Sequence, residues 1–283
     1  MAYTNGASAG PIHAGERFTE AETKRIMEAL SRDGYCFLGT SILEQDEVAA
    51  LRDAMERMIA DPAMQEDQPG NHRKARSLMR MFEYDRSFRD LIVREPFASL
   101  AEEVLDDQCH VMGQNALFTE PNPDATADGP GGWHLDDLVQ FPLPPEIPRH
   151  DPGVPLPCNV MQLFTPLTSI DSVACGPTQL VPQSHYAGRR PTVQDRPHFD
   201  GNGPVSILAE PGDAYIFNNQ VWHRGAPNAS DRRRLLGGAT YSKRYVAQRF
   251  YPFIDYHMPE HVWEGAGPRL QRMLGRHKSG SYG

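Results

Sequence analysis

The first hundred residues alternate between helical periodicity and short breaks. Thr19 and Glu22 form a capping box, in which each side chain meets the backbone amide of the other residue, so a helix is expected to begin there. The helix is expected to stop at Asp33-Gly34 and to be followed by a short apolar strand over 35–38. Helical spacing then predicts a second helix whose apolar face contains Val48, Leu51, Met55, Met58 and Ile59. Further predicted elements are a loop over 62–76 and short helices near 86–94 and 97–105.

From about residue 108 the pattern changes to short runs rich in Val, Leu, Phe and Tyr, separated by clusters of Pro, Gly and Asp. Such runs predict strands, and many short strands with turns between them favour a sandwich or barrel. We expect these strands near 109–119, 137–141, 158–167, 178–182, 205–208, 213–217, 221–224 and 234–246. Two long segments, 120–132 and 142–157, predict loops of the length that often forms lids or binding loops.

The chain is 283 residues long and is expected to form one domain over 17–283 after a disordered tail over 1–16. That domain would consist of a mainly helical flank over 17–107, a β-rich core over 108–250 and a C-terminal extension over 251–283.

Charge and hydropathy narrow the class of protein. There are 28 basic and 37 acidic side chains, a formal net charge of −9, which argues against a nucleic-acid partner. No apolar run approaches the roughly 20 residues of a membrane span, and the N-terminus has no secretory pattern. Four cysteines lie far apart without CxxC spacing, which excludes a zinc ribbon and fits a cytoplasmic location.

A metal-binding pattern lies in the β-rich half. In Trp133-His134-Leu135-Asp136, His134 and Asp136 share a face if the chain is extended, because strand side chains alternate. His223 follows an aromatic strand, and with this pair it completes the two-histidine, one-carboxylate set that holds non-haem iron(II). The alternatives are a solvated turn for the HxD pair and an ordinary core or surface histidine for His223.

Three adjacent arginines, Arg232, Arg233 and Arg234, precede an apolar strand. Such a run is ordinarily a solvated face, but an arginine at the start of a core strand can reach into a barrel and clamp a carboxylate. On extended chain Arg232 and Arg234 share one face, so periodicity does not choose between them.

Taken together, these residues resemble the phytanoyl-CoA dioxygenase-like family of iron(II)- and 2-oxoglutarate-dependent oxygenases, over roughly 20–250. The matching segments are 33–38 (DGYCFL), 133–136 (WHLD) and 176–185 (GPTQLVPQSH). Gln183 departs from the family pattern, in which glycine is usual, so that turn is expected to differ in shape.

The downstream residues follow the same resemblance. His223 matches the distal metal ligand, Asn228 and Ser230 match the pattern that follows, and the family places a 2-oxoglutarate-binding arginine eleven residues after the ligand, where this chain has Arg234.

The resemblance implies a mostly β fold with flanking α-helices around a double-stranded β-helix, a jelly-roll core of the cupin type. It implies that His134, Asp136 and His223 are the catalytic metal ligands for Fe(II). Arg234, Thr178 and Gln114 would contact the cosubstrate 2-oxoglutarate, and O2 would be the oxidant.

The implied reaction is hydroxylation, or a related oxidation, of an unactivated C–H bond in a small molecule, with release of succinate and CO2. We expect a specialised metabolite from a biosynthetic pathway as substrate. Halogenating relatives lack the carboxylate that Asp136 supplies, so chlorination is not expected.

Two other readings remain open: a non-catalytic jelly-roll protein that binds a small molecule, and a cupin-type metal enzyme of another reaction class. Substrate charge also stays open, because the basic run over 71–76 favours an anionic group whereas the acidic total favours a cationic or neutral one. Core packing is the expected role of Val139 and Tyr241, with pocket lining as the alternative.

Overall fold

The computed structural model describes residues 13, 15–61, 77–193 and 195–280. The predicted tail over 1–16 lies mostly outside these residues, and the predicted loop over 62–76 lies wholly outside them. The helices are α1 (Glu20–Asp33), α2 (Gln45–Ala60), α5 (Met81–Tyr84), α6 (Arg86–Val93), α7 (Phe97–Leu105), α8 (Glu260–Trp263) and α9 (Pro268–Met273), with short 3₁₀ turns η1 (Ser184–Ala187) and η2 (Phe253–Asp255).

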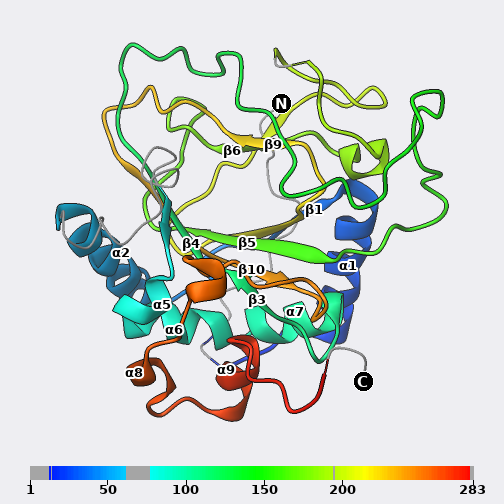
Figure 1. Ribbon diagram of the computed structural model, residues 1–283. Helices are drawn as coiled ribbons and strands as arrows, with labels where there is room; N and C mark the ends of the chain where they lie inside the picture. Colours follow the sequence, from blue (N-terminus) through cyan, green and yellow to red (C-terminus); the bar gives the residue numbers. More distant parts are fainter. Residues whose placement is uncertain (1–12, 14, 62–76, 194, 281–283) are drawn as a thin grey trace.

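Two antiparallel sheets form the centre of the structure. The larger has the order β1-β8-β5-β10-β4-β2, with β3 also paired to β10, and the smaller has the order β7-β6-β9. The strands are β1 (Tyr35–Gly39), β2 (Ser77–Met79), β3 (His110–Gly113), β4 (Asn115–Thr119), β5 (Val160–Pro166), β6 (Thr178–Leu180), β7 (Val205–Ser206), β8 (Ala214–Asn218), β9 (His223–Gly225) and β10 (Arg234–Ser242). Figure 1 shows α5, α6 and α7 below the larger sheet and β6 and β9 above it. This is the double-stranded β-helix with flanking helices that the sequence predicts.

The first helix begins and ends where its capping residues predict. The Glu22 amide donates to the Thr19 hydroxyl at 3.3 Å, and the Thr19 amide donates to the Glu22 carboxylate at 2.8 Å. Gly34 ends the helix in the left-handed conformation, at φ 82°, and donates to the Leu30 carbonyl. A Cβ at Gly34 would lie 2.3 Å from the Val221 side chain, so the close approach also requires glycine.

Alternation along the central strands divides the side chains between two compartments. On β5, Met161 and Leu163 join the apolar core between the larger sheet and the helices, whereas Phe164 packs in the cluster between the two sheets. On β10, Leu235 faces the helices and Leu236 faces the space between the sheets. Period-two geometry therefore directs the even-numbered residues of these two strands into the barrel.

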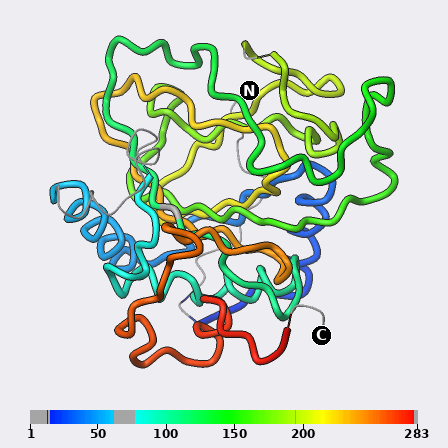
Figure 2. Tube along the Cα trace, in the orientation of Figure 1, coloured from blue at the N-terminus to red at the C-terminus, as the bar shows by residue number. Residues whose placement is uncertain are grey.

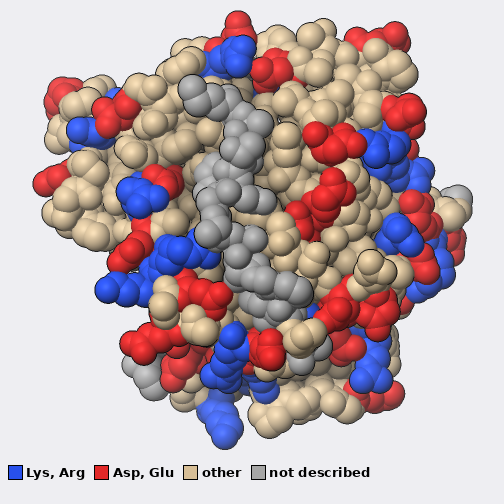
Figure 3. All heavy atoms as spheres, turned by 180° about the vertical axis from the view of Figure 1, so that it is seen from behind, with Lys and Arg blue, Asp and Glu red and all other residues tan. Residues whose placement is uncertain are grey.

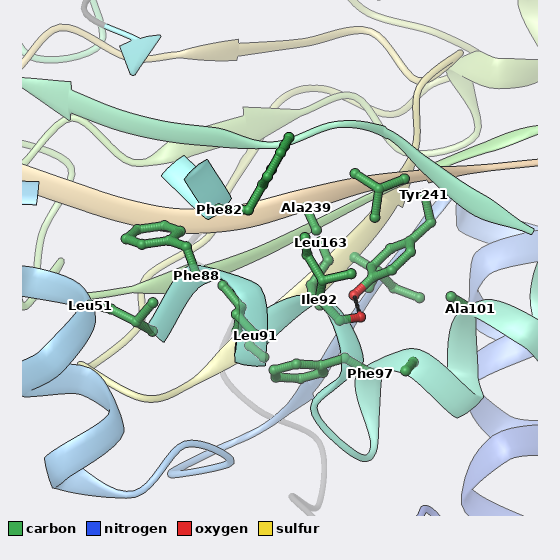
Figure 4. Close-up of a cluster of buried hydrophobic side chains, with 14 of the residues drawn as sticks. Leu51, Phe82, Phe88, Leu91, Ile92, Phe97, Ala101, Leu163, Ala239 and Tyr241 are labelled. Atoms are coloured by element: carbon green, nitrogen blue, oxygen red, sulfur yellow. Dashed lines mark hydrogen bonds between the residues drawn. The ribbon is translucent and has the colours of Figure 1, made fainter. Parts of the chain in front are cut away.

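Tyr241 belongs to the helix-facing core. It is fully buried, and its hydroxyl donates to the Ile92 carbonyl at 2.9 Å. Figure 4 shows Tyr241 among Ile92, Phe97 and Leu163, with the helices beneath the sheet. The structure thus gives Tyr241 the packing role, and Val139 packs against the buried cluster around Trp133.

All four cysteines are free thiols. Burial raises the pKa of Cys36 to about 11 and the pKa values of Cys109 and Cys158 to about 12, so these thiols are poor nucleophiles at neutral pH. The cytoplasmic location predicted from the cysteines stays a prediction.

Acidic and basic side chains are interspersed on the surface. Figure 3 shows them as neighbours on the face opposite to that of Figure 1. Arg269 illustrates the pattern, since it pairs with both Glu95 and Glu102. Among the described helices, none combines the length and hydropathy that a membrane span requires.

Candidate metal centre

His134 and His223 are brought together by their backbones. The two residues form an isolated antiparallel bridge, in which the His134 amide donates to the His223 carbonyl at 3.0 Å and the reverse bond is 2.8 Å. Asp136 completes the group: one ligand atom from each of the three side chains lies within 4.8 Å of the others. In the described part of the chain, this is the one cluster of His, Cys, Asp or Glu with such geometry.

Hydrogen bonds set the orientation of both imidazoles. His134 Nδ1 lies 2.7 Å from the Gly132 carbonyl oxygen, and His223 Nδ1 lies 2.8 Å from the Val221 carbonyl oxygen. A carbonyl only accepts, so each Nδ1 carries the proton and each Nε2 keeps a free lone pair. The Nε2 atoms of His134 and His223 lie 3.5 and 3.6 Å from the Asp136 carboxylate oxygens. Two lone pairs and a carboxylate therefore converge, as a metal requires.

Asp136 is held as an anion. Burial opposes its ionisation, but the adjacent imidazoles, His223 foremost, and the Arg249 guanidinium outweigh burial and hold the pKa of the Asp136 carboxyl well below its usual range. Gln162 on β5 donates to Asp136 Oδ2 at 2.7 Å. The side-chain Oε1 of Gln162 in turn accepts from the Thr240 hydroxyl at 2.6 Å. This chain of bonds orients the carboxylate from the floor of the barrel.

The strand predicted over 137–141 is wrong. The segment consists of bends, and Asp137 has a left-handed φ of 59° that interrupts extended chain. Its backbone polar groups bond to the turn between β8 and β9 instead of a neighbouring strand: the Gln140 amide donates to Gln220 Oε1 at 2.8 Å, and Gln220 Nε2 donates to the Leu138 carbonyl at 3.1 Å. Asn219 Nδ2 also donates to Asp137 Oδ2 at 3.0 Å.

Asn219 and Gln220 are therefore positioning residues for the HxD segment. Neither they nor Gln162 were predicted from the sequence. The available signal was two adjacent polar residues directly before the Val221-Trp222-His223 run, at a site where an apolar strand would otherwise continue.

The three candidate ligands open onto a cavity of about 360 Å³ between the sheets. Besides His134, Asp136 and His223 it is lined by Ser77, Met79, Leu117, Gln162, Phe164, Thr178, Phe217, Arg224, Gly225, Arg234, Arg249 and Phe253. Figure 1 shows where β5, β9 and β10, which supply several of these side chains, lie relative to one another. The cavity is thus partly apolar, with cationic groups beside it.

Arg234 is the buried cation of this cavity. Its side chain is 6% exposed, its Nη2 donates to the Thr119 hydroxyl at 2.9 Å, and its Nη1 donates to the Gly176 carbonyl. Its Nε is buried without a hydrogen-bond partner, and no carboxylate among the described residues forms an ion pair with it. Burial lowers the pKa of the Arg234 guanidinium. A buried, uncompensated guanidinium is costly, so this site is suited to an anion.

The neighbouring arginines point elsewhere. Arg232 is half-exposed and pairs with Asp171, whereas Arg233 pairs with Glu56 and Glu120. Of the three, Arg234 alone lines the cavity in the structure.

Thr178 and Gln114 differ in their placement. Thr178 lines the cavity, and its hydroxyl lies 2.7 Å from that of Tyr215. Gln114 is not among the lining residues, so the structure gives no support to its expected contact with the cosubstrate, which stays a prediction. Its side chain faces the helices: Oε1 accepts from the Phe82 amide at 2.8 Å, and Nε2 donates to the Phe88 carbonyl at 2.9 Å. The strand breaks at Gln114, between β3 and β4, which turns this side chain to the helical layer.

Arg224, next to His223, ties the segment before the HxD motif to β9. The side chain is buried, donates to the Gly131 carbonyl at 2.8 Å and pairs with Asp128. Its guanidinium carbon also lies 4.8 Å from the centre of the Trp133 ring. The C-terminal end of the irregular segment 120–132 is therefore held on β9 by Arg224. The irregular segment 142–157 is attached to η1 through the His150 amide, which donates to the Tyr186 carbonyl at 2.8 Å.

Gln183 adopts a backbone conformation that favours glycine. Its φ is 66°, in the left-handed region, and its amide donates to the Asp33 carbonyl at 2.9 Å. The turn therefore carries the conformational cost of a left-handed residue that is not glycine, and the expected difference in shape from the family stays a prediction.

These residues fit iron(II) and 2-oxoglutarate on chemical grounds. Two neutral imidazoles and one carboxylate on one side of a cavity leave the facing positions free for other ligands. The buried Arg234, whose Nε has no partner among the described residues, is suited to the remote carboxylate of a dicarboxylic acid.

Two relatives found by comparison with known proteins share about a quarter of their aligned residues with this chain. An uncharacterised protein of Mycobacterium tuberculosis is 24% identical over 237 residues, which cover 82% of this chain and 78% of the relative. The dioxygenase af480 of Aspergillus fumigatus is 25% identical over 195 residues, 68% of this chain and 56% of the relative.

Two solved structures share the fold. The epimerase SnoN in complex with Fe3+, alpha ketoglutarate and nogalamycin RO matches with a TM-score of 0.62 and 21% identity, covering 84% of this chain and 91% of SnoN. HygX from Streptomyces hygroscopicus, with nickel and 2-oxoglutarate bound, matches with a TM-score of 0.57 and 15% identity, covering 80% and 89%. The family model described as Phytanoyl-CoA dioxygenase (PhyH) matches residues 30–236. The chain therefore belongs to the phytanoyl-CoA dioxygenase family, whose members use iron(II), 2-oxoglutarate and O2.

Proposed function

We propose that this protein is an iron(II)- and 2-oxoglutarate-dependent dioxygenase that oxidises an unactivated C–H bond of a small specialised metabolite and releases succinate and CO2. One observation carries the proposal: three side chains that could hold a metal converge in a cavity that also contains a buried arginine with no carboxylate partner among the described residues. The relatives named as a dioxygenase and as enzymes with bound 2-oxoglutarate support the same chemistry.

His134, Asp136 and His223 would hold the metal, and iron(II) when bound supplies the reaction of O2 with 2-oxoglutarate. Arg234 would receive the remote carboxylate of 2-oxoglutarate, and Thr178 would offer a hydroxyl near it. Phe164 and Phe217 form an apolar wall beside the ligands, which excludes water from the reacting centre.

The cofactors alone do not identify the reaction product. SnoN is named as an epimerase, so this fold also serves reactions other than hydroxylation. Asp136 occupies the position that a halide takes in halogenating relatives, and this supports oxygenation, desaturation or ketone formation over chlorination. For a cupin-type enzyme of another class, three or four histidines with a glutamate would be usual, and the described cluster has two histidines with an aspartate.

The test is reconstitution of the full chain with Fe(II) under anaerobic conditions, followed by addition of 2-oxoglutarate, ascorbate and O2. We expect 2-oxoglutarate to bind to the metal-loaded protein and succinate to form, faster with substrate present. A metal-loaded protein that neither binds 2-oxoglutarate nor forms succinate contradicts the proposal and favours a non-catalytic binding protein.

A further inference from the structure

The segment that follows β10 forms one side of the cavity. Phe250 in this segment is packed among other aromatic rings: its ring lies 5.1 Å from the Phe82 ring and 5.2 Å from the Tyr256 ring. The Tyr256 hydroxyl donates to Glu83 at 2.7 Å. Figure 2 shows this segment in orange, running back beside the larger sheet. Phe250 and Tyr256 therefore anchor both ends of the short turn that carries Phe253.

Phe253 is exposed and yet lines the cavity. It is 63% exposed and adopts a left-handed φ of 64°, a conformation that is uncommon for a bulky side chain. Its neighbour Ile254 is 94% exposed and does not line the cavity. An anchored turn thus presents an uncovered aromatic ring at the cavity wall, where a ligand would bury it.

Arg249 is the cation on the same side. Its Nη1 pairs with Asp137, whose other carboxylate oxygen accepts from Asn219. Its Nε is buried, and no described residue provides it with an acceptor. Because Asp137 directly follows the metal ligand Asp136, the pairing holds the Arg249 guanidinium beside the metal centre.

The remaining walls favour a flat, apolar molecule without positive charge. The Phe164 and Phe217 rings are stacked, with centroids 6.0 Å apart and planes 19° from parallel. Asp136 is the one acidic side chain among the described residues that line the cavity, and as a proposed metal ligand it is not free to bind an organic cation. Among the described lining residues, the cavity therefore offers aromatic faces and arginine donors, and Asp136 is its one carboxylate.

We propose that Arg249 and Phe253 recognise the primary substrate, and that this substrate is a ring-bearing, largely apolar molecule with an oxygen anion such as a carboxylate or an ionised phenol. Phe253 packs on the ring system, and Arg249 donates to the oxygen. The inference rests on the proposed function, since it assigns the 2-oxoglutarate position to Arg234 and leaves Arg249 for the substrate.

Two probes with one ring system and opposite charge test this assignment: 2-naphthoate and 2-naphthylmethylammonium. Each is titrated calorimetrically into the full chain loaded anaerobically with Fe(II) and 2-oxoglutarate. We expect the wild type to bind 2-naphthoate at least roughly tenfold more tightly, because a charge-assisted hydrogen bond discriminates by about that factor. In Arg249→Gln the preference should fall below roughly threefold, and Phe253→Ala should weaken both probes by roughly tenfold.

Matched variants separate local recognition from general effects. Arg244→Gln removes a cation outside the cavity, and Ile254→Ala removes the exposed neighbour of Phe253; both should bind the probes as the wild type does. An unchanged charge preference in Arg249→Gln, or equal behaviour of Phe253→Ala and Ile254→Ala, overturns the corresponding assignment. A wild type that binds 2-oxoglutarate but neither probe overturns both assignments.

Binding of 2-oxoglutarate separates a failure of the substrate assignment from a failure of the proposed dioxygenase function. Arg249→Gln should bind the cosubstrate within roughly threefold of the wild type, as expected if Arg234 holds the remote carboxylate. A large loss in Arg249→Gln would make Arg249 a cosubstrate residue and contradict the inference alone. Failure of the metal-loaded wild type to bind 2-oxoglutarate would instead contradict the proposed function.

Discussion

His134 and His223 are partners across an isolated antiparallel bridge, and their imidazole rings lie with centroids 4.3 Å apart. Because the bridge consists of two backbone hydrogen bonds, the separation of the two candidate ligands is set by main chain rather than by side-chain rotamers. The hydrogen bond from each Nδ1 to a carbonyl then sets the direction of each Nε2. The site is therefore organised before a metal enters, which reduces the entropy lost on binding.

Loss of any candidate ligand should abolish metal binding while the fold persists. We expect His134→Ala, Asp136→Ala and His223→Ala each to lower Fe(II) affinity by on the order of 100-fold or more, since a three-ligand site loses both affinity and geometry. Metal content after dialysis, with circular dichroism for the fold, measures this. His198→Ala is the matched control, because His198 is exposed and lies outside the cavity. A variant that retains full metal content and turnover removes its residue from the site.

Gln162 should act on the metal through Asp136. Gln162→Leu removes the donor that lies 2.7 Å from Asp136 Oδ2, and loss of such a supporting bond lowers metal affinity by roughly 10–100-fold. Thr240→Val removes the hydroxyl behind Gln162 and should cost less than roughly threefold, because the bond to Asp136 remains. Competition with a fluorescent chelator gives both affinities. Equal affinities for Gln162→Leu and the wild type would show that Asp136 needs no such support.

Arg234 should determine the affinity for 2-oxoglutarate. Arg234→Lys retains the charge but loses the planar fork, so the KM for 2-oxoglutarate should rise by roughly one to two orders of magnitude, equivalent to about 1.5–3 kcal/mol. Steady-state succinate formation measures it.

Arg232→Lys and Arg233→Lys are built-in controls. Their partners Asp171 and Glu120 lie outside the cavity, and the KM should change less than roughly threefold. If Arg232→Lys gave the large effect, the cosubstrate clamp would be misassigned.

His185 should make the folded state sensitive to acid. Its Nε2 donates to the Ser31 carbonyl at 3.0 Å, while Nδ1 is buried without a partner in the described part of the chain. Burial lowers the pKa of this histidine to about 4. Between about pH 6.5 and about pH 4 the unfolded chain takes up a proton that the folded chain does not, so stability falls as the pH falls. The full contribution is about 3 kcal/mol.

Urea unfolding of the wild type and of His185→Gln, at about pH 7.5 and about pH 4.5, measures this contribution. Gln can still donate to the Ser31 carbonyl but does not titrate, so the variant should lose less stability between the two conditions. Identical pH dependence of the two proteins would contradict the role assigned to His185.

Local signals identified much of the fold correctly. The capping box at Thr19 and the helix end at Gly34 depend on interactions within a few residues, so both can be predicted from the sequence. The break at Gln114 is different. Its amide joins the Phe82 amide to the Phe88 carbonyl, and those groups come within reach only once the helices pack on the sheet.

The sequence by itself determined which residues are candidates for the chemistry: the HxD pair, His223 and an arginine at the start of β10, whose spacing along the chain is a property of sequence. Tertiary structure alone decided that Gln162, Asn219 and Gln220 support them, and that Arg249 and Phe253 close one side of the cavity. The physical reason is that periodicity shows which face of an element a side chain takes. It does not show which distant element meets that face, because that depends on how all the layers pack together.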